Sequence, residues 1–208
     1  AVFARAKVGE LMATVTLNPT ADAPIRSNSP TSNFGNDNLV VGELNDQTGY
    51  VRRSLLRFDI PLVSNAIVQS ATLRLYQNTD YSSNARDFRV YRLLRAWVES
   101  QVTWNVYSTG NSWQTAGGFG ANDCEQTAIG TRTMSASETT GYKEWALDTA
   151  GIQGMMRGTF TNNGFLVKAD TEANDAYEYN SREDASNKPE LVIVYELGGR
   201  QFQAVIIG

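Results

Sequence analysis

The chain has 208 residues, of which 41% are apolar and 10% aromatic, and this is enough to bury one substantial core. Its net charge of -4 and its scattered basic residues argue against nucleic acid as a partner, because polyanions are bound through clustered lysine and arginine. No apolar run approaches the roughly 18 residues of a membrane helix, so we expect no membrane insertion.

The cysteine and histidine content restricts the chemistry further. Cys124 is the single cysteine, and the chain contains no histidine. An internal disulfide and a cysteine-based zinc site are therefore excluded, and so are catalytic triads that use histidine as the base.

In chain order, the hydrophobic pattern predicts one strand after another. Residues 1–12 alternate with a period of two and favour a strand, although the same stretch is also rich in helix formers. Further strands separated by turn residues are predicted within ATVTLNP, ADAPIRS, NLVVGE, YVRRSLLRFDIP, AIVQSATLRLYQN and DFRVYRLL.

Two segments depart from this pattern. Residues 107–133 are rich in Gly, Asn and Ser and are too long for a turn, so they predict an ordered surface excursion anchored by Trp113 and Phe119. The segment LDTAGIQGMMRG predicts one short helix, with Asp148 at its N-cap and Gly158 at its end.

Residues 164–196 predict three strands in a row: GFLVKA, AYEYNSR and ELVIVYE. Both side-chain parities of ELVIVYE are apolar, which predicts a central strand covered on both faces. Together these elements predict an all-β fold, a jelly-roll-like antiparallel β-sandwich with one short helix.

Several segments together resemble the DNRLRE domain family: ADAPIRSNSPTSNFGN, SLLRFDIP, SATLRLY, WVESQVTW, NSWQTAGG, NNGFLVKA and NSREDASNKPELVIVYE. Members of that family are secreted jelly-roll sandwiches related to polysaccharide-binding modules. The resemblance spans residues 14–196, and it implies an extracellular, non-catalytic β module that recognises acidic or cell-wall glycans. Residues 1–13 and the Gly-hinged strand at 197–208 lie outside it as terminal extensions.

An enzymatic reading would need a pair of carboxylates placed as in glycosidases. Simpler roles explain several candidates, since Asp148 suits a helix cap, Asp59 a turn, and Glu183 an ion pair with Arg182. We therefore expect no enzyme. The carboxylates considered are Asp59, Glu99, Glu144, Asp148, Glu178 and Glu183.

Calcium is the metal that the sequence favours, because it binds hard oxygen ligands and several acids lie in Asn-rich loops. No EF-hand-like spacing is present, and the alternative is that these acids are solvated and set turns. The candidate ligands are Asp22, Asp37, Asp46, Asp123 and Glu125.

Glycan binding would use exposed aromatic rings and arginines. Trp113, with Tyr107 in the same long loop, is the expected exposed pair, whereas tryptophans on strands belong to a core. Arg52, Arg53 and Arg182 are candidates to hold a uronate carboxylate, with ordinary surface charge as the alternative.

Two functions of different class follow. The apolar, alternating termini favour an extracellular filament or matrix subunit, a homopolymer in which a terminal strand of one copy completes the sheet of the next. The alternative is a carbohydrate-binding module for acidic or cell-wall polysaccharide, with each terminus an ordinary strand of its own sheet. The residues assigned to assembly are Val2, Ala4, Ala6, Val8, Phe202, Ala204 and Ile206.

Overall fold

The structure is a computed structural model that describes residues 12–44, 49–82, 84–173 and 175–198. This part of the chain forms thirteen strands and one helix, so the predicted all-β antiparallel sandwich with a single short helix is confirmed. The elements are β1 (Met12–Leu17), β2 (Pro19–Arg26), β3 (Leu39–Glu43), β4 (Val51–Phe58), β5 (Ala66–Asp80), β6 (Arg86–Arg92), β7 (Val106–Ser108), β8 (Asn111–Ser112), β9 (Gly130–Met134), β10 (Gly141–Leu147), α1 (Thr149–Met156), β11 (Phe165–Ala169), β12 (Ala176–Tyr179) and β13 (Glu190–Leu197).

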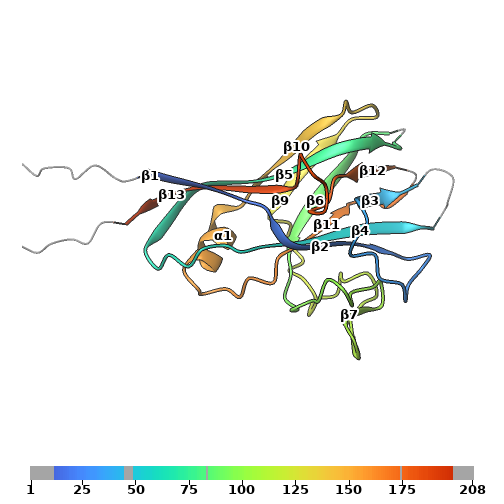
Figure 1. Ribbon diagram of the computed structural model, residues 1–208, viewed down its shortest axis with the longest axis horizontal. Helices are drawn as coiled ribbons and strands as arrows, with labels where there is room; N and C mark the ends of the chain where they lie inside the picture. The colour runs from blue at the N-terminus through green and yellow to red at the C-terminus, as the bar shows by residue number, and fades with distance from the viewer. Residues whose placement is uncertain (1–11, 45–48, 83, 174, 199–208) are drawn as a thin grey trace, which may run out of the picture.

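The 15-residue strand β5 joins the layers of the sandwich. It pairs with β13 and then β12 along one edge, and with β10 along the other. From β10 the pairing runs through β9, β6, β11, β4, β3 and β12 and returns to β5, so the strands close around the main core. In Figure 1, β5, β10 and β13 lie above β2 and β4. β1 extends the β13 edge, and β2 pairs with β4.

The main core lies inside this ring of strands and is rich in large side chains such as Leu73, Phe88 and Phe165. Trp145 is buried there, and its indole nitrogen donates to the carbonyl of Phe88 at 2.9 Å, which satisfies the polar end of the ring. The short helix α1 packs against β5 and closes the core with Ile152, among others.

A second core lies on the opposite side of β4 and β11, beneath the long excursion between β6 and β9. This excursion, residues 93–129, begins earlier than the predicted 107–133 and ends before the strand β9. Leu55 and Leu166 point into it from these two strands, and Trp97 and Trp113 cover them from the excursion. In Figure 1 the excursion, which carries β7, lies below β2 and β4. The prediction that Trp113 and Phe119 anchor this segment is confirmed, since Trp113 is buried and Phe119 packs against the same cluster.

β11 is covered on both faces, whereas β13 is not. All five residues of β11 are buried, with Phe165 facing the main core and Leu166 the second. In β13 only Leu191 and Ile193 are buried, while Val192, Val194 and Tyr195 stay partly exposed. The expectation that ELVIVYE is covered on both faces is therefore wrong, because the excursion covers β11 and not β13. The central position of ELVIVYE is confirmed, since β13 pairs with β1 on one side and β5 on the other.

The helix prediction is confirmed at both ends. Asp148 is the N-cap of α1, and its carboxylate accepts the backbone N–H groups of Ala150 and Gly151 at 3.3 Å. After the cap residue Arg157, Gly158 adopts a φ of 73° and ends the helix.

The residues assigned to assembly, Val2 to Val8 and Phe202 to Ile206, lie outside the described residues, as does Asp46. The terminal strands and the boundaries of the terminal extensions therefore stay predictions. Within the described ranges, the structure holds no helix that is long and apolar enough to cross a membrane.

Candidate functional site

A shallow polar groove of about 400 Å³ lies where β2, β4, β3 and β12 meet. Arg52 of β4 pairs with Arg26 of β2 on one side and with Gly42 of β3 on the other. Glu178 of β12 pairs with Val40 of β3, which brings a carboxylate to the same surface. The groove is lined by Arg26, Asp37, Asn38, Val40, Arg52 and Glu178.

Hydrogen bonds hold the groove side chains in place. Arg26 donates to Asp37 at 2.6 Å, and its guanidinium lies 3.9 Å from the centre of the Phe34 ring. Asn38 donates its amide to Glu178 at 2.9 Å, and the Tyr81 hydroxyl donates to the other oxygen of Glu178 at 3.3 Å. These contacts hold several polar side chains in fixed positions along the groove, and such a surface can bind the hydroxyl groups of a sugar.

Two exposed tyrosines belong to the same end of the sandwich. Tyr81 follows β5 and is 38% exposed, and Tyr50 precedes β4 and is 41% exposed. A tyrosine that is this exposed can offer a ring face to an apolar surface and still use its hydroxyl.

Of the three arginines predicted from the sequence, Arg52 lines the groove. Arg53 points the opposite way: it is 9% exposed, pairs with Glu172 through two hydrogen bonds, and donates to the carbonyl of Gly117. Arg182 pairs with Glu99 through two hydrogen bonds, at 2.7 and 2.9 Å.

The predicted exposure of Trp113 is wrong. The ring is 5% exposed, and its indole nitrogen donates to the carbonyl of Thr103 at 3.0 Å. Tyr107 lies partly buried against it, with 5.4 Å between the ring centres. The two rings pack in the second core because the excursion folds back over β4 and β11.

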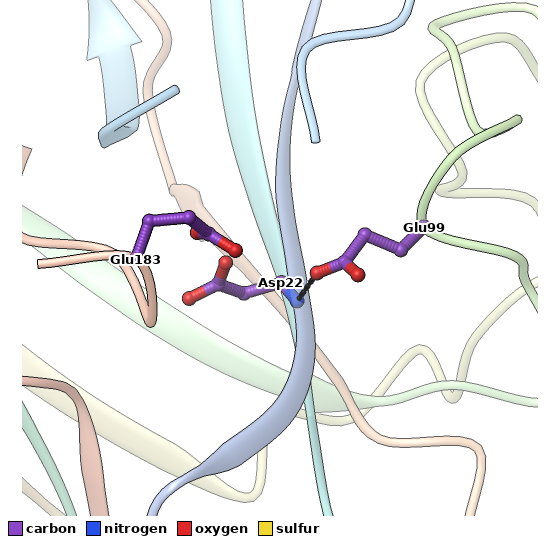
Figure 2. A group of neighbouring side chains, drawn as sticks. All are labelled: Asp22, Glu99 and Glu183. Carbon is purple, nitrogen blue, oxygen red and sulfur yellow. Dashed lines mark hydrogen bonds between the residues drawn. The ribbon is translucent and has the colours of Figure 1, made fainter. Parts of the chain in front are cut away.

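Three carboxylates from distant parts of the chain meet beside β2: Asp22, Glu99 and Glu183 (Figure 2). Each offers an oxygen within 4.8 Å of the others. The Asp22 side chain points toward Glu183, while Glu99 approaches from the other side of the strand and accepts the backbone N–H of Asp22 at 2.7 Å. We call this group the β2 carboxylate cluster.

Burial has a marked effect on Asp22, which is 0% exposed. Loss of solvent, reinforced by the nearby charges of Glu183 and Glu99, raises the pKa of Asp22 to about 7, against a smaller opposing effect of the hydrogen bond from the Arg182 backbone. Arg182 bridges the two glutamates, and its 3.0 Å contact with Glu183 is the ion pair predicted from the sequence.

The other predicted calcium ligands lie apart from Asp22 and have different partners. Asp37 pairs with Arg26 in the groove, and Glu125 pairs with Arg92. Asp123 is fully buried and accepts backbone N–H groups from Gln114, Thr115 and Gly120 at 2.9 to 3.1 Å, so it organises the excursion.

The remaining carboxylates weighed for catalysis are also dispersed. Glu144 pairs with Arg74 on β5, Asp148 caps α1, and Asp59 is exposed just after β4. Glu178 lies in the groove, and Glu99 and Glu183 belong to the β2 carboxylate cluster.

Sequence reasoning missed Arg26 and Asn38 as groove residues, and it missed Tyr81, which donates to Glu178 of the groove. Asn38 and its partner Glu178 are 140 positions apart in the chain, so no local motif links them. The available signal was weak: Arg26 and Asn38 flank the predicted loop between two strands, where side chains at strand ends can converge.

A second groove of about 510 Å³ lies on the excursion, beside the β7–β8 hairpin. Hydroxyl and amide groups dominate its lining, which includes Thr103, Asn105 and Gln101 and has no charged side chain. This second groove is the alternative binding surface for an uncharged sugar.

Comparison with known proteins places the chain in a family. The sequence model of carbohydrate-binding module family 96 matches residues 13–195, most of the chain. No curated protein matches the chain. Modules of such families are non-catalytic, which agrees with the expectation that the chain is not an enzyme, while the narrower resemblance to the DNRLRE domain family stays a prediction. The chain belongs to carbohydrate-binding module family 96.

Proposed function

We propose that this protein is an extracellular polysaccharide-binding module and that the groove between β2 and β12 is its sugar-binding surface. The observation that carries this placement is the hydrogen bonding that fixes the groove side chains. Arg26 is held by Asp37, and Glu178 is held by Asn38 and Tyr81. Arg52 lines the same groove. Membership of the family supports carbohydrate as the ligand class.

The groove offers both halves of the hydrogen bonds that sugar hydroxyls make. Carboxylates of Asp37 and Glu178 accept hydrogen bonds, while Asn38 and the guanidinium groups donate them. Because neighbouring groups already hold these side chains, less conformational entropy is lost when a ligand binds.

Arg52 is the residue that we assign to an acidic sugar. A guanidinium can bind a carboxylate through two parallel hydrogen bonds, and this geometry suits the carboxylate of a uronic acid. Arg52 lines the groove between β2 and β3, and we assign to it the preference for an acidic over a neutral chain.

The family match supports the binding function over the filament subunit that the sequence analysis preferred. Nothing in the described residues bears on self-assembly, since the residues assigned to it lie outside them. Binding to polysaccharide is therefore the function that we put forward.

Affinity electrophoresis in native gels tests this proposal. The gels contain alginate, polygalacturonate or a neutral β-glucan, and the retardation of the wild type gives a dissociation constant for each. We expect retardation by an acidic polysaccharide that weakens as salt is added. Arg52→Ala and Tyr81→Ala should each weaken it by about tenfold, the equivalent of about 1.4 kcal/mol.

Arg89→Ala is the matched control, because Arg89 is a comparably accessible arginine on β6 whose ion pairs with Asp87 and Asp170 are open to solvent. All three variants should melt close to the wild type, since surface changes usually stay within about 0.5 kcal/mol. Wild-type protein that runs unretarded in every gel would contradict carbohydrate binding. Retardation that Arg52→Ala and Arg89→Ala alter equally would contradict the groove.

A further inference from the structure

In the β2 carboxylate cluster, the carboxylates outnumber the cations that contact them among the described residues. Asp22, Glu99 and Glu183 supply three carboxylates, and Arg182 is the cation that contacts them, at 2.7 Å from Glu99 and 3.0 Å from Glu183. With all three acids ionised, the group would hold a net charge close to -2 beside a fully buried side chain. A charge of this kind is retained in proteins when it is paired or coordinates a metal.

The hydrogen bonds of Asp22 leave one oxygen unsatisfied. Its Oδ2 accepts the backbone N–H of Arg182 at 2.8 Å. Its Oδ1 is buried and has no hydrogen-bond partner among the described residues. Figure 2 shows the carboxylate pointing toward Glu183 and away from the backbone of β2. A buried carboxylate oxygen without a partner is unfavourable, so its position calls for a positively charged ligand.

We propose that Asp22, Glu99 and Glu183 bind one calcium ion. A divalent cation would balance the two excess negative charges and supply the partner that Asp22 Oδ1 lacks. The ligands are all oxygen atoms, as calcium prefers. They come from a strand and two loops, a mixed arrangement that fits the irregular coordination of calcium better than the strict octahedron of magnesium, and water would complete the shell.

Arg182 is a positioning residue in this site. Its two hydrogen bonds to Glu99 orient that carboxylate, much as hydrogen-bonded neighbours orient metal ligands elsewhere. The ion would then connect β2 to the excursion through Glu99 and to the loop before β13 through Glu183. These three segments are 77 or more positions apart in the chain, so binding should stabilise the folded protein.

The test begins with protein treated with EDTA and desalted, to which calcium chloride alone is added. Isothermal titration should report one ion per chain, and the melting temperature should rise as calcium is added. Magnesium at the same concentration should produce a smaller rise. The wild type failing to bind calcium and melting at the same temperature with and without it would overturn the proposal.

Two variants and one control locate the ion. Glu183→Gln should weaken calcium binding by at least tenfold. Asp22→Asn should also remove the response, yet it should melt at or above the wild type in EDTA, because it relieves the crowding of carboxylates. If Asp22 had only a structural role and bound no ion, Asp22→Asn would melt below the wild type in EDTA. Asp37→Asn, which changes a predicted ligand outside the cluster, should respond to calcium as the wild type does. Unchanged calcium binding by both cluster variants would place the ion elsewhere and refute this site.

Discussion

Arg53 and Glu172 form a partly buried ion pair in which Nε donates to Oε1 at 2.7 Å and Nη2 donates to Oε2 at 2.8 Å. The third nitrogen of the guanidinium donates to the carbonyl of Gly117 at 2.8 Å, and the group lies 4.9 Å from the centre of the Trp104 ring. Arg53 therefore joins β4 to the segment after β11 and to the excursion. Its neighbour Arg52 lines the proposed sugar groove on another surface.

Arg53→Ala should destabilise the protein by about 2 kcal/mol, because it removes three hydrogen bonds and leaves the partly buried Glu172 with only the longer 3.9 Å contact to Lys168. Urea denaturation would measure the change in the free energy of unfolding. Arg89→Ala, whose pairs are exposed to solvent, should change it by less than about 0.5 kcal/mol. A loss below about 1 kcal/mol for Arg53→Ala would show that the pair does not hold the excursion.

Trp113→Ala should lower the free energy of unfolding by about 3 to 5 kcal/mol, since it leaves a large cavity in the second core. Trp113→Phe keeps most of the volume and loses the hydrogen bond to Thr103, so its cost should be about 1 to 2 kcal/mol. Denaturation in urea gives both values. If Trp113→Ala kept full stability and lost polysaccharide binding, the ring would be a sugar platform after all.

Asp123→Asn should loosen the excursion, because the amide replaces one of the two accepting oxygens with an NH2 group and can no longer accept all three N–H groups of residues 114, 115 and 120. We expect a loss of about 2 kcal/mol and faster cleavage within residues 107–128 in limited proteolysis. Asp37→Asn, in an exposed ion pair, is the control and should be cut at the wild-type rate. Equal rates for the two variants would disprove this role for Asp123.

Cys124 should resist alkylation in the folded protein. Burial, with a smaller effect of the Asp123 charge, raises the pKa of its thiol from 9.0 to about 12. At pH 8 its reaction with iodoacetamide should be about 100-fold slower than after unfolding, because the reactive form is the thiolate. Mass spectrometry would follow the modification, and rapid labelling without denaturant would contradict a buried thiol.

The same shift predicts a pH dependence of stability. The folded protein holds the thiol proton more tightly than the unfolded chain, so the stabilising contribution is complete below pH 9 and is lost as the pH rises to about 12. Cys124→Ala should lose less stability than the wild type over this range in thermal melts. Parallel curves for the two proteins would mean that Cys124 does not titrate there.

Elements defined by short-range patterns could be predicted from the sequence. The helix followed from Asp148, its apolar spacing and Gly158, all within a few turns, and β4 lies within the predicted strand segment YVRRSLLRFDIP. Such signals come from neighbours along the chain. Whether a second layer covers a strand depends on distant segments, which is why the apolar pattern of β13 was mistaken for full burial and β11 was passed over.

The candidate site was harder to predict for the same reason. Arg52 was identified by its chemistry, whereas Arg26, Asn38 and Tyr81 acquire their role only when β2, β3, β4 and β12 come together. Asp22 was proposed as a calcium ligand, but the glutamates that meet it come from positions 99 and 183. The sequence offered no reason to group these acids, because their proximity is created by the folded loops.

Backbone amide shifts in an NMR titration test the central claim most directly. An oligosaccharide derived from the polysaccharide that retains the protein would be added to the ¹⁵N-labelled chain. If the groove is the sugar-binding surface, the largest shifts will fall on residues 37–40, Arg52, Tyr81 and Glu178, and residues 101–112 of the second groove will stay unchanged. Shifts concentrated at residues 101–112, or no saturable shifts at all, would contradict this account.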